Sequence, residues 1–210
     1  MTRLCVPDAG QRRDLAVFVH RVLRLDGAAV IRLRTRADGL IGAWATTGFD
    51  VLAGKVVAGV LEPTDFTCGA DQLGRALDAA TAEGWVDAGY SIDSAWRTAL
   101  PPETGFVHLD DVPAVVVADL ARQGAELARE HAGPQGPPAS LLDQEVLQVS
   151  AESDAVDVPM RCVMALTAMG FMPEAEDEVV RVRMMPTWLR IDARFGSVFR
   201  RRGGPALLLG

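Results

Sequence analysis

Charge is sorted along this sequence, and the sorting limits how the chain can fold. Residues 106–178 carry 3 basic and 14 acidic residues, a net charge of −11, whereas residues 179–210 carry 7 arginines and one aspartate, a net charge of +6. Residues 1–105 are nearly balanced, with 11 basic and 13 acidic residues. An acidic middle beside a basic end predicts either that the two neutralise each other within the molecule or that one of them docks on a partner.

The composition is that of a globular protein with a substantial core. A length of 210 residues suffices for one large domain or two small ones, and 49% of the residues are hydrophobic. The longest apolar runs, residues 56–61 and 112–118, are far shorter than the roughly 20 residues of a membrane-spanning helix. Residues 1–6 lack the apolar segment of a signal peptide. We therefore expect a cytoplasmic protein that does not contact a membrane.

The cysteines give no sign of a disulfide framework or of a metal site. Cys5, Cys68 and Cys162 are odd in number and far apart, and no two of them form a CxxC pair. This spacing is typical of reduced thiols in a cytosolic protein. The sequence predicts no metal and no cofactor.

The N-terminal half reads as an α-β-β-β-α unit. Residues 11–24 place apolar side chains at helical spacing, and residues 28–35 alternate as a half-exposed strand does. Residues 40–46 and 51–61 predict two further strands, and a helix should follow from Asp71 to Glu83.

The C-terminal half predicts helices and a small sheet. We expect a helix over residues 112–131, with Asp111 as its N-cap, then a Gly/Pro linker at 133–138. A short element at 141–149, a polar acidic loop at 150–157, an apolar helix at 159–169, strands at 179–184, 188–192 and 197–201, and a frayed end from residue 203 should follow.

The predicted fold class is therefore α+β. An N-terminal α-β-β-β-α unit precedes a central helix, and a C-terminal helix with a three-stranded antiparallel meander completes the chain. The expected division is an N-terminal domain over residues 1–105, the central helix and linker over 106–138, and a C-terminal domain over 139–210.

The basic C-terminal hairpin is the leading candidate for a binding site. On the strand 179–184, Arg181 and Arg183 share one face because side chains alternate along a strand. Arginine grips carboxylates and phosphates through paired hydrogen bonds. We expect an acidic protein partner, or a second copy in a homodimer, to dock on the set Arg181, Arg183, Arg190, Arg194, Arg200, Arg201 and Arg202.

Two alternatives stay open. A helix followed by a basic hairpin is similar to a winged-helix DNA binder, but the helix carries one charged residue, Arg161, and the sequence pI of about 5.0 argues against nucleic acid. A pocket between the two halves, near Trp96, His108 and Asp110, could instead bind a small molecule or house an enzyme. No nucleophile elbow or phosphate loop is present, so no catalytic residue is assigned and a non-catalytic role is favoured.

Several idiosyncratic segments resemble a known group of proteins. They include Ala95-Trp96-Arg97 and the segments 100–103, 158–161, 165–171, 188–190 and 195–198. Together these segments resemble a family of uncharacterised conserved hypothetical proteins of high-GC bacteria, which has no assigned function. The resemblance implies no site residues. Our expectation is a cytosolic binding or assembly protein.

Overall fold

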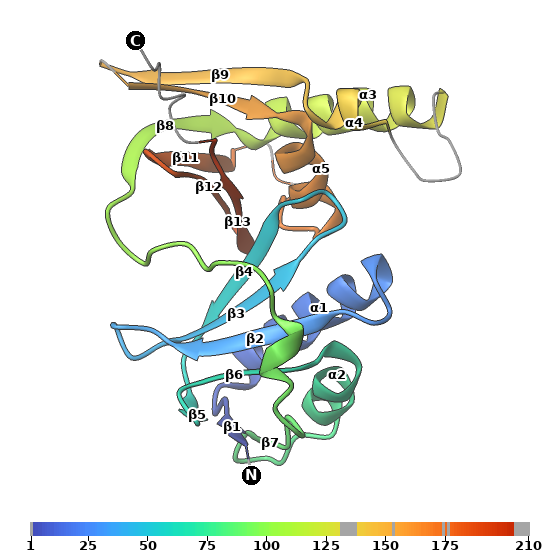
Figure 1. Ribbon diagram of the computed structural model, residues 1–210, viewed down its shortest axis with the longest axis vertical. Coiled ribbons are helices and arrows are strands. Elements are labelled where there is room, and N and C mark those ends of the chain that lie inside the picture. Colours follow the sequence, from blue (N-terminus) through green and yellow to red (C-terminus); the bar gives the residue numbers. More distant parts are fainter. Residues whose placement is uncertain (1, 131–137, 153, 174, 176, 204–210) are drawn as a thin grey trace. The chain divides into compact units, whose positions relative to one another are not determined.

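The chain folds as a mixed α+β protein in which helices pack on antiparallel sheets (Figure 1). The computed structural model describes residues 2–130, 138–152, 154–173, 175 and 177–203. They form two compact units, which we describe separately. Unit 1 comprises residues 1–48 and 52–103, and unit 2 comprises residues 49–51 and 104–210. The expected three-part division of the chain stays a prediction, and its linker at 133–138 and its frayed end lie almost entirely outside the described residues.

Unit 1 contains an antiparallel sheet with strand order β6-β2-β3-β4 and a smaller sheet with order β5-β1-β7. Its elements are β1 (Arg3–Cys5), α1 (Ala9–Leu25), β2 (Val30–Thr35), β3 (Ile41–Thr46), β4 (Leu52–Val57), β5 (Val60–Glu62), β6 (Asp65–Gly69), α2 (Ala70–Asp78), β7 (Trp85–Val86) and the 3-10 helix η1 (Asp93–Ala95).

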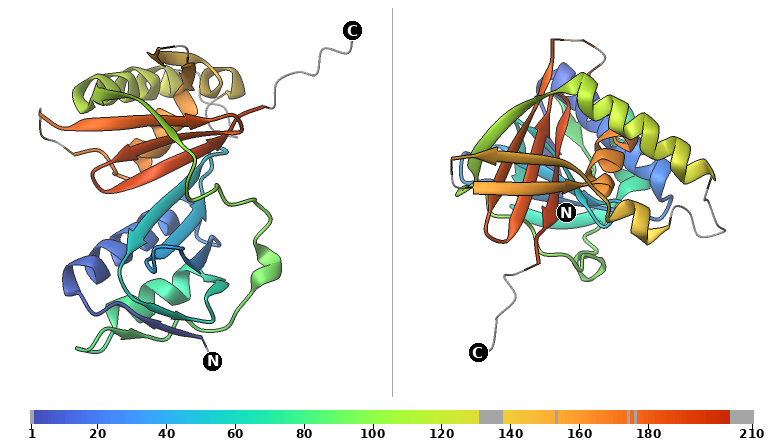
Figure 2. Two further views of the ribbon diagram at one scale, coloured as in Figure 1. Left: turned by 90° about the vertical axis from the view of Figure 1, so that its left-hand side faces the viewer. Right: turned by 90° about the horizontal axis from the view of Figure 1, so that it is seen from above.

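The core of unit 1 lies between the larger sheet and the two helices. Asp8 caps α1 by accepting the Gln11 N–H at 2.7 Å. One stripe of α1 and the facing side of the sheet are buried, and α1 packs against α2 and β4 on one side of these strands (Figure 2). The buried side chains include Leu15, Phe18, Val19 and Val22 of α1 and Ile31, Leu33, Ile41 and Phe66 of the sheet.

Unit 2 contains an antiparallel sheet with order β13-β12-β11-β8 and a separate β9–β10 hairpin. Its elements are β8 (Val107–Pro113), α3 (Ala114–Glu130), α4 (Ala139–Leu142), β9 (Glu145–Ala151), β10 (Asp154–Pro159), α5 (Met160–Ala168), β11 (Val179–Met185), β12 (Trp188–Ala193) and β13 (Gly196–Arg201).

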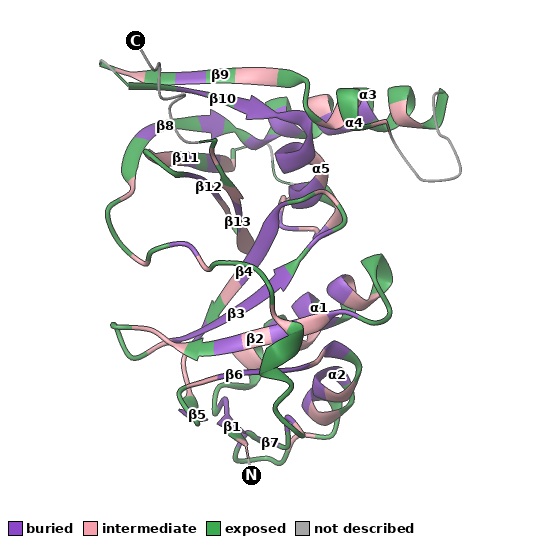
Figure 3. Ribbon diagram, viewed as in Figure 1, coloured by how far each residue is buried: buried purple, intermediate pink, exposed green. Residues whose placement is uncertain are grey.

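Helix α5 forms the centre of unit 2. Most of its residues are buried, as the purple ribbon in Figure 3 shows. It packs against α3 and β13, and the sheet buries Val180, Val182, Leu189, Ile191 and Val198 on one face. This dense core explains why the sequence of α5 is so apolar.

The structure corrects several expected elements of the C-terminal half. The helix expected from residue 112 begins at Ala114, and the preceding residues form β8, so Asp111 is not an N-cap. The residues of β8 pair with β11 instead of beginning the helix, because Leu109 and Val112 enter the core and Asp111 lies opposite Arg181. The expected acidic loop at 150–157 belongs instead to the β9–β10 hairpin, which buries Val149, Val156 and Val158 and leaves its acidic residues exposed.

The N-terminal half also differs from the expected α-β-β-β-α unit. Strand β1 precedes the first helix, and the strand expected at 51–61 is divided into β4 and β5. The division falls at Gly59, which lies against the carbonyl oxygen of Cys5. Strand β6 pairs with β2, so the larger sheet has one more strand than expected on that side. In unit 2 the expected meander is present as β11–β12–β13, and β8 extends it.

Candidate functional site

Four of the seven arginines predicted to bind a partner share one face of the unit 2 sheet. Strand register places Arg183 opposite Arg190, and Trp188 opposite both Met185 and Arg201. Because directly paired residues lie on the same side of a sheet, we define the arginine face by Arg181, Arg183, Arg190 and Arg201. Arg200 lies on the opposite face, and Arg194 and Arg202 lie outside the strands.

The centre of the arginine face is a shared ion pair. Arg183 and Arg190 both contact the carboxylate of Asp192, and the bond from Arg190 Nε to Asp192 Oδ1 is 2.7 Å long. The Ser197 hydroxyl donates to the same Oδ1 at 2.5 Å. The Asp192 side chain is only 14% exposed. Two guanidinium groups therefore share one partly buried carboxylate.

Two phenylalanine rings fix the position of Arg190. Its guanidinium carbon lies 5.6 Å from the Phe106 ring centre and 5.4 Å from that of Phe199. The two rings meet edge to face, with centres 6.2 Å apart and an angle of 70°. Such contacts stabilise a cation over an aromatic face and hold its plane in one orientation.

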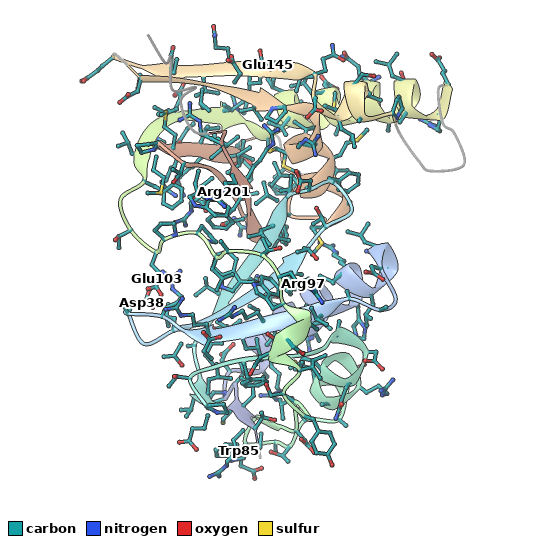
Figure 4. The ribbon with its side chains drawn as sticks, viewed as in Figure 1. Asp38, Trp85, Arg97, Glu103, Glu145 and Arg201 are labelled. Atoms are coloured by element: carbon teal, nitrogen blue, oxygen red, sulfur yellow. The ribbon has the colours of Figure 1, made fainter. Side chains whose placement is uncertain are left out.

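The basic and acidic segments neutralise each other in part within one chain. Arg181 Nε lies 3.7 Å from Asp111, Arg194 lies 2.5 Å from Glu178, and Arg200 lies 3.6 Å from Asp143. Arg202 donates to the Met185 carbonyl at 3.3 Å. Arg201 is exposed and has no ion pair within the described part of the chain (Figure 4). The charge sorting of the sequence is thus explained in part by ion pairs within the chain.

The residues of the alternative pocket belong to different units. Trp96 is part of unit 1, where its indole N–H donates to the Thr98 carbonyl, whereas His108 and Asp110 lie on β8 of unit 2. His108 Nε2 is 3.4 Å from Asp111, and Asp110 accepts the Asp111 N–H at 2.8 Å. That pocket therefore stays untested.

The described residues do not assemble a metal or nucleophile site. No group of three His, Cys, Asp or Glu side chains among them could hold a metal ion. Cys5, Cys68 and Cys162 are buried and unpaired. Burial raises the pKa of Cys68 to about 12 and that of Cys162 to about 12, so these two thiols stay protonated at neutral pH.

Unit 1 has a shallow hollow beside β1, β7 and α2. Two adjoining cavities of about 620 and 490 Å³ share Thr2 and Asp87 in their walls. Tyr90, which is 87% exposed, borders the first, and Trp85 borders the second. Figure 4 labels Trp85, whose ring lies 4.6 Å from the Arg3 guanidinium. The mixed charge of Arg3 and Asp87 gives the hollow no preference for one class of ligand.

An exposed stripe of α1 that carries two arginines escaped the sequence analysis. Arg13, Val17, His20 and Arg24 recur at spacings of 4, 3 and 4 residues and form the exposed stripe of the helix. Arg13 and Arg24 are exposed and have no ion pair within the described residues. Arg21 lies beside them. The pKa of Arg21 is lowered, chiefly by its partial burial and further by repulsion from the charge of Arg24. The signal was present in the sequence, because the face opposite a predicted apolar stripe must be solvent-exposed.

Among the described helices, none has the length and hydrophobicity that crossing a membrane requires.

Family models match both halves of the chain. Residues 1–98 match a domain of unknown function (DUF8010), and residues 101–205 match a second domain of unknown function (DUF8185). No curated protein is detectably similar in sequence. The resemblance to an uncharacterised family is therefore confirmed, and its restriction to high-GC bacteria stays a prediction.

Solved structures similar to this chain are bacterial DNA polymerase sliding clamps. The Bacillus subtilis clamp is 13% identical with a TM-score of 0.60, and the match covers 98% of this chain and 65% of the clamp. The Caulobacter crescentus clamp is 12% identical with a TM-score of 0.57, covering 99% and 67%. The Thermotoga maritima DNA polymerase III beta subunit is 10% identical with a TM-score of 0.55, covering 98% and 66%. The chain thus spans about two thirds of their length and shares their fold.

This likeness corrects the functional expectations drawn from the sequence. The proposed role of the arginine hairpin in docking an acidic protein surface was wrong, because the neighbours in structure are DNA clamps. The argument against nucleic acid was wrong for the same reason, and the alternatives of a winged helix and of a small-molecule protein are set aside with it. The DUF8185 model covers half of the residues, and we conclude that the chain belongs to this family of domains of unknown function.

Proposed function

We propose that this chain is a DNA-associated protein that works in the manner of a sliding clamp. The observation that carries the proposal is the similarity of 98–100% of the chain to DNA sliding clamps and DNA polymerase III beta subunits. The repeated build of the two units supports it. In each unit two helices pack together, α1 with α2 and α3 with α5, beside an antiparallel sheet of four strands.

Helix α1 is the best candidate for the contact with DNA. Its exposed stripe carries Arg13 and Arg24, neither of which is paired with a carboxylate in the part of the chain that the structure describes, and Arg21 adds a third positive charge. The one acidic residue of the helix, Asp14, accepts from Lys55 Nζ at 3.1 Å and is thereby neutralised. Exposed arginines such as Arg13 and Arg24 bind phosphates and release counterions, which supplies affinity for DNA without recognition of its base sequence.

Helix α3 of unit 2 is less suited to this role. Arg122 pairs with Asp119 at 3.1 Å and approaches Glu126 at 3.9 Å, and Arg129 donates to the Ala125 carbonyl. Arg122 is thus matched by acidic side chains of the same helix, Arg129 is committed to a backbone carbonyl, and the acidic residues of α3 outnumber its arginines, so α3 offers no net positive charge. We therefore assign the DNA contact to unit 1.

A DNA ligand and three unpaired buried thiols both support a cytoplasmic location.

The test is binding of a labelled DNA duplex, followed by fluorescence anisotropy at low salt. We expect the intact chain to bind duplexes of unrelated sequence with similar affinity. The double variant Arg13→Ala/Arg24→Ala should bind several-fold more weakly, because two phosphate contacts are lost. Arg122→Ala on α3 is the control for each single variant, Arg13→Ala or Arg24→Ala, since it likewise removes one positive charge from an exposed helix face, and it should bind as the parent does.

Two results would contradict the proposal. The absence of DNA binding at low salt would contradict the proposed clamp-like function. Equal weakening by Arg122→Ala and by a single α1 variant would show that affinity follows total charge rather than the α1 stripe. Circular dichroism of each variant confirms that the fold is retained.

A further inference from the structure

We propose that His20 of α1 and Asp78 of α2 make the binding of DNA to α1 dependent on pH. The protonated imidazole neutralises the Asp78 carboxylate, and loss of the proton leaves that carboxylate unbalanced beside the exposed stripe of α1. This inference rests on the proposed function, because it concerns the same surface, and it adds the group that regulates DNA binding there.

His20 lies within the exposed stripe of α1, between the two arginines assigned to the DNA contact. Because a helix rises 1.5 Å per residue, His20 is about 6 Å along the axis from Arg24 and about 10 Å from Arg13. Charges at such separations still interact at about 0.1 M salt, where the Debye length is about 10 Å. A change of charge at His20 therefore alters the attraction of this stripe for phosphates.

Helix α2 supplies the carboxylate that His20 contacts. His20 Nε2 lies 3.2 Å from one Asp78 oxygen and 3.1 Å from the other. The imidazole lies against Gly74, one turn before Asp78, where an added Cβ would be 3.4 Å from His20 Cε1. The ring therefore rests on the backbone of α2. The His20 and Asp78 side chains are 48% and 59% exposed, so solvent protons reach both.

The other charged groups on the elements packed against His20 keep their charge near neutral pH. On α2, Arg75 pairs with Asp71 at 2.9 Å, and on β4, Lys55 pairs with Asp14 of α1 at 3.1 Å. On α1 itself the neighbouring charges are the arginines at 13, 21 and 24, and arginine stays protonated in this range. Histidine is the side chain that ordinarily changes charge between pH 5 and 8.

Asp78 has no ion pair besides that with His20 in the part of the chain that the structure describes. When His20 is protonated, the charges of the pair sum to zero, and the stripe presents Arg13 and Arg24 to DNA. When His20 is neutral, the pair carries one negative charge, which repels phosphates.

The direction of the pH dependence follows from these two states. DNA binds better to the form with protonated His20, so binding is coupled to proton uptake. The affinity should consequently fall as the pH rises, by at most about tenfold per pH unit, the limit for the uptake of one proton.

The test is fluorescence anisotropy of a labelled DNA duplex with the full chain between pH 5.5 and 7.5, at constant low ionic strength. We expect the affinity of the parent chain to fall several-fold across this range. His20→Gln retains a hydrogen-bond donor for Asp78 but cannot gain a charge, so its affinity should be independent of pH and close to that of the parent at pH 7.5. His108→Gln is the matched control, because His108 is also an exposed histidine beside an aspartate, 3.4 Å from Asp111, and lies in unit 2. It should retain the pH dependence of the parent.

A second variant tests the role of the carboxylate. Asp78→Asn should bind the duplex several-fold more tightly than the parent at pH 7.5, and its affinity should still fall with rising pH, because His20 is present. Asp71→Asn removes the same charge from the same helix, but Asp71 contacts Arg75 rather than His20. Its effect on affinity should be smaller than that of Asp78→Asn. Circular dichroism and the melting temperature of each variant confirm that the fold is retained.

Three results would overturn the inference. They are duplex binding by the parent that does not change with pH, a pH dependence that His20→Gln retains, and equal tightening by Asp78→Asn and Asp71→Asn. Each of them leaves the DNA contact of α1 in place, so the proposed function survives. The absence of duplex binding at every pH would contradict both the proposed function and this inference, and the two failures are thereby distinguished.

Discussion

Arg161, in the first turn of α5, donates to Asp143 Oδ1 at 2.5 Å, and this pair joins two segments of unit 2. The same guanidinium donates to the Phe49 carbonyl at 2.8 Å and approaches Asp50 at 3.7 Å. Its side chain is only 10% exposed, and its Nε has no hydrogen-bond partner in the described residues. The single charge of an apolar helix is therefore structural rather than a contact to a ligand.

Replacing Arg161 should destabilise the protein more than replacing a neighbouring arginine. Arg161→Ala removes a buried chain of methylenes and leaves the Phe49 carbonyl without its donor, so a loss of about 2–4 kcal/mol is expected. Arg200→Ala removes a looser contact to the same Asp143, at 3.6 Å, and should cost less than about 1 kcal/mol. Urea unfolding of both variants measures the difference, and equal losses would show that the Arg161 contacts contribute little.

Because β4 and β5 are separated at Gly59, we expect that adding one methyl group at this residue lowers the stability of the protein. A Cβ at Gly59 would overlap the backbone carbonyl of Cys5, which cannot move without disturbing β1. Gly59→Ala should therefore lower the stability by about 1–3 kcal/mol and the melting temperature by several degrees. Gly48→Ala is the control, since nothing lies within 4 Å of its Cβ position. Similar melting temperatures for the two variants would contradict the register of β1 with β5.

The buried thiols should be inert in the native protein. Because burial raises the pKa of Cys68 and of Cys162 to about 12, each is a neutral thiol at any pH below that value. Alkylation with iodoacetamide at pH 8, followed by mass spectrometry, should leave both unmodified until denaturant is added. Rapid labelling of either residue in the folded chain would show that its burial is wrong.

Asp93 should give unit 1 a stability that acid removes. Its pKa is lowered by hydrogen bonds from Ser91 and from the Thr67 N–H, which lies 2.7 Å from Asp93 Oδ1. Since the folded state favours the ionised form, the stabilisation is complete above the ordinary pKa of 3.8 and falls as the pH drops below it. Asp93→Asn should thus be less stable than the parent at pH 7, with the difference shrinking towards pH 3.

That comparison is made by chemical unfolding at both pH values. Asp87→Asn, in the same connection between β7 and η1, provides a carboxylate control. If the Asp93→Asn deficit is unchanged at pH 3, the carboxylate charge is not what holds the segment against β6.

Local patterns predicted the helices that carry a clear apolar stripe. The stripe of Leu15, Phe18 and Val22 placed the first helix within a few residues of its observed bounds, Ala9–Leu25. The alternation of valine and arginine placed β11 equally well. Strand β8 was missed because its edge position leaves Asp110 and Asp111 exposed, and an aspartate before an apolar run is equally typical of a helix N-terminus. Pairing with β11 decides between the two, and pairing is not local information.

The candidate site, too, could be predicted from local sequence patterns only in part. Alternation alone placed Arg181 and Arg183 on one face, but the position of Arg190 opposite Arg183 depends on the register of β11 and β12. The charge sorting suggested that the acidic segment would neutralise the arginines, and it does so for Arg181, whereas Arg183 and Arg190 depend on Asp192 within the basic segment. The similarity to sliding clamps could not be read from the sequence, because at 10–13% identity the fold is retained by burial pattern and strand pairing.

The measurement that tests the account most directly is the salt dependence of duplex binding by the intact chain. Each phosphate contact contributes about −0.9 to the slope of the logarithm of the binding constant against the logarithm of the salt concentration. With Arg13 and Arg24 each contacting one phosphate, the slope should be about −1.8 or steeper, and it should become shallower by about 1.8 in Arg13→Ala/Arg24→Ala. The proposed contact of α1 with DNA would be contradicted by a parent chain that does not bind duplex DNA at low salt, or by a slope that is the same in the double variant as in the parent.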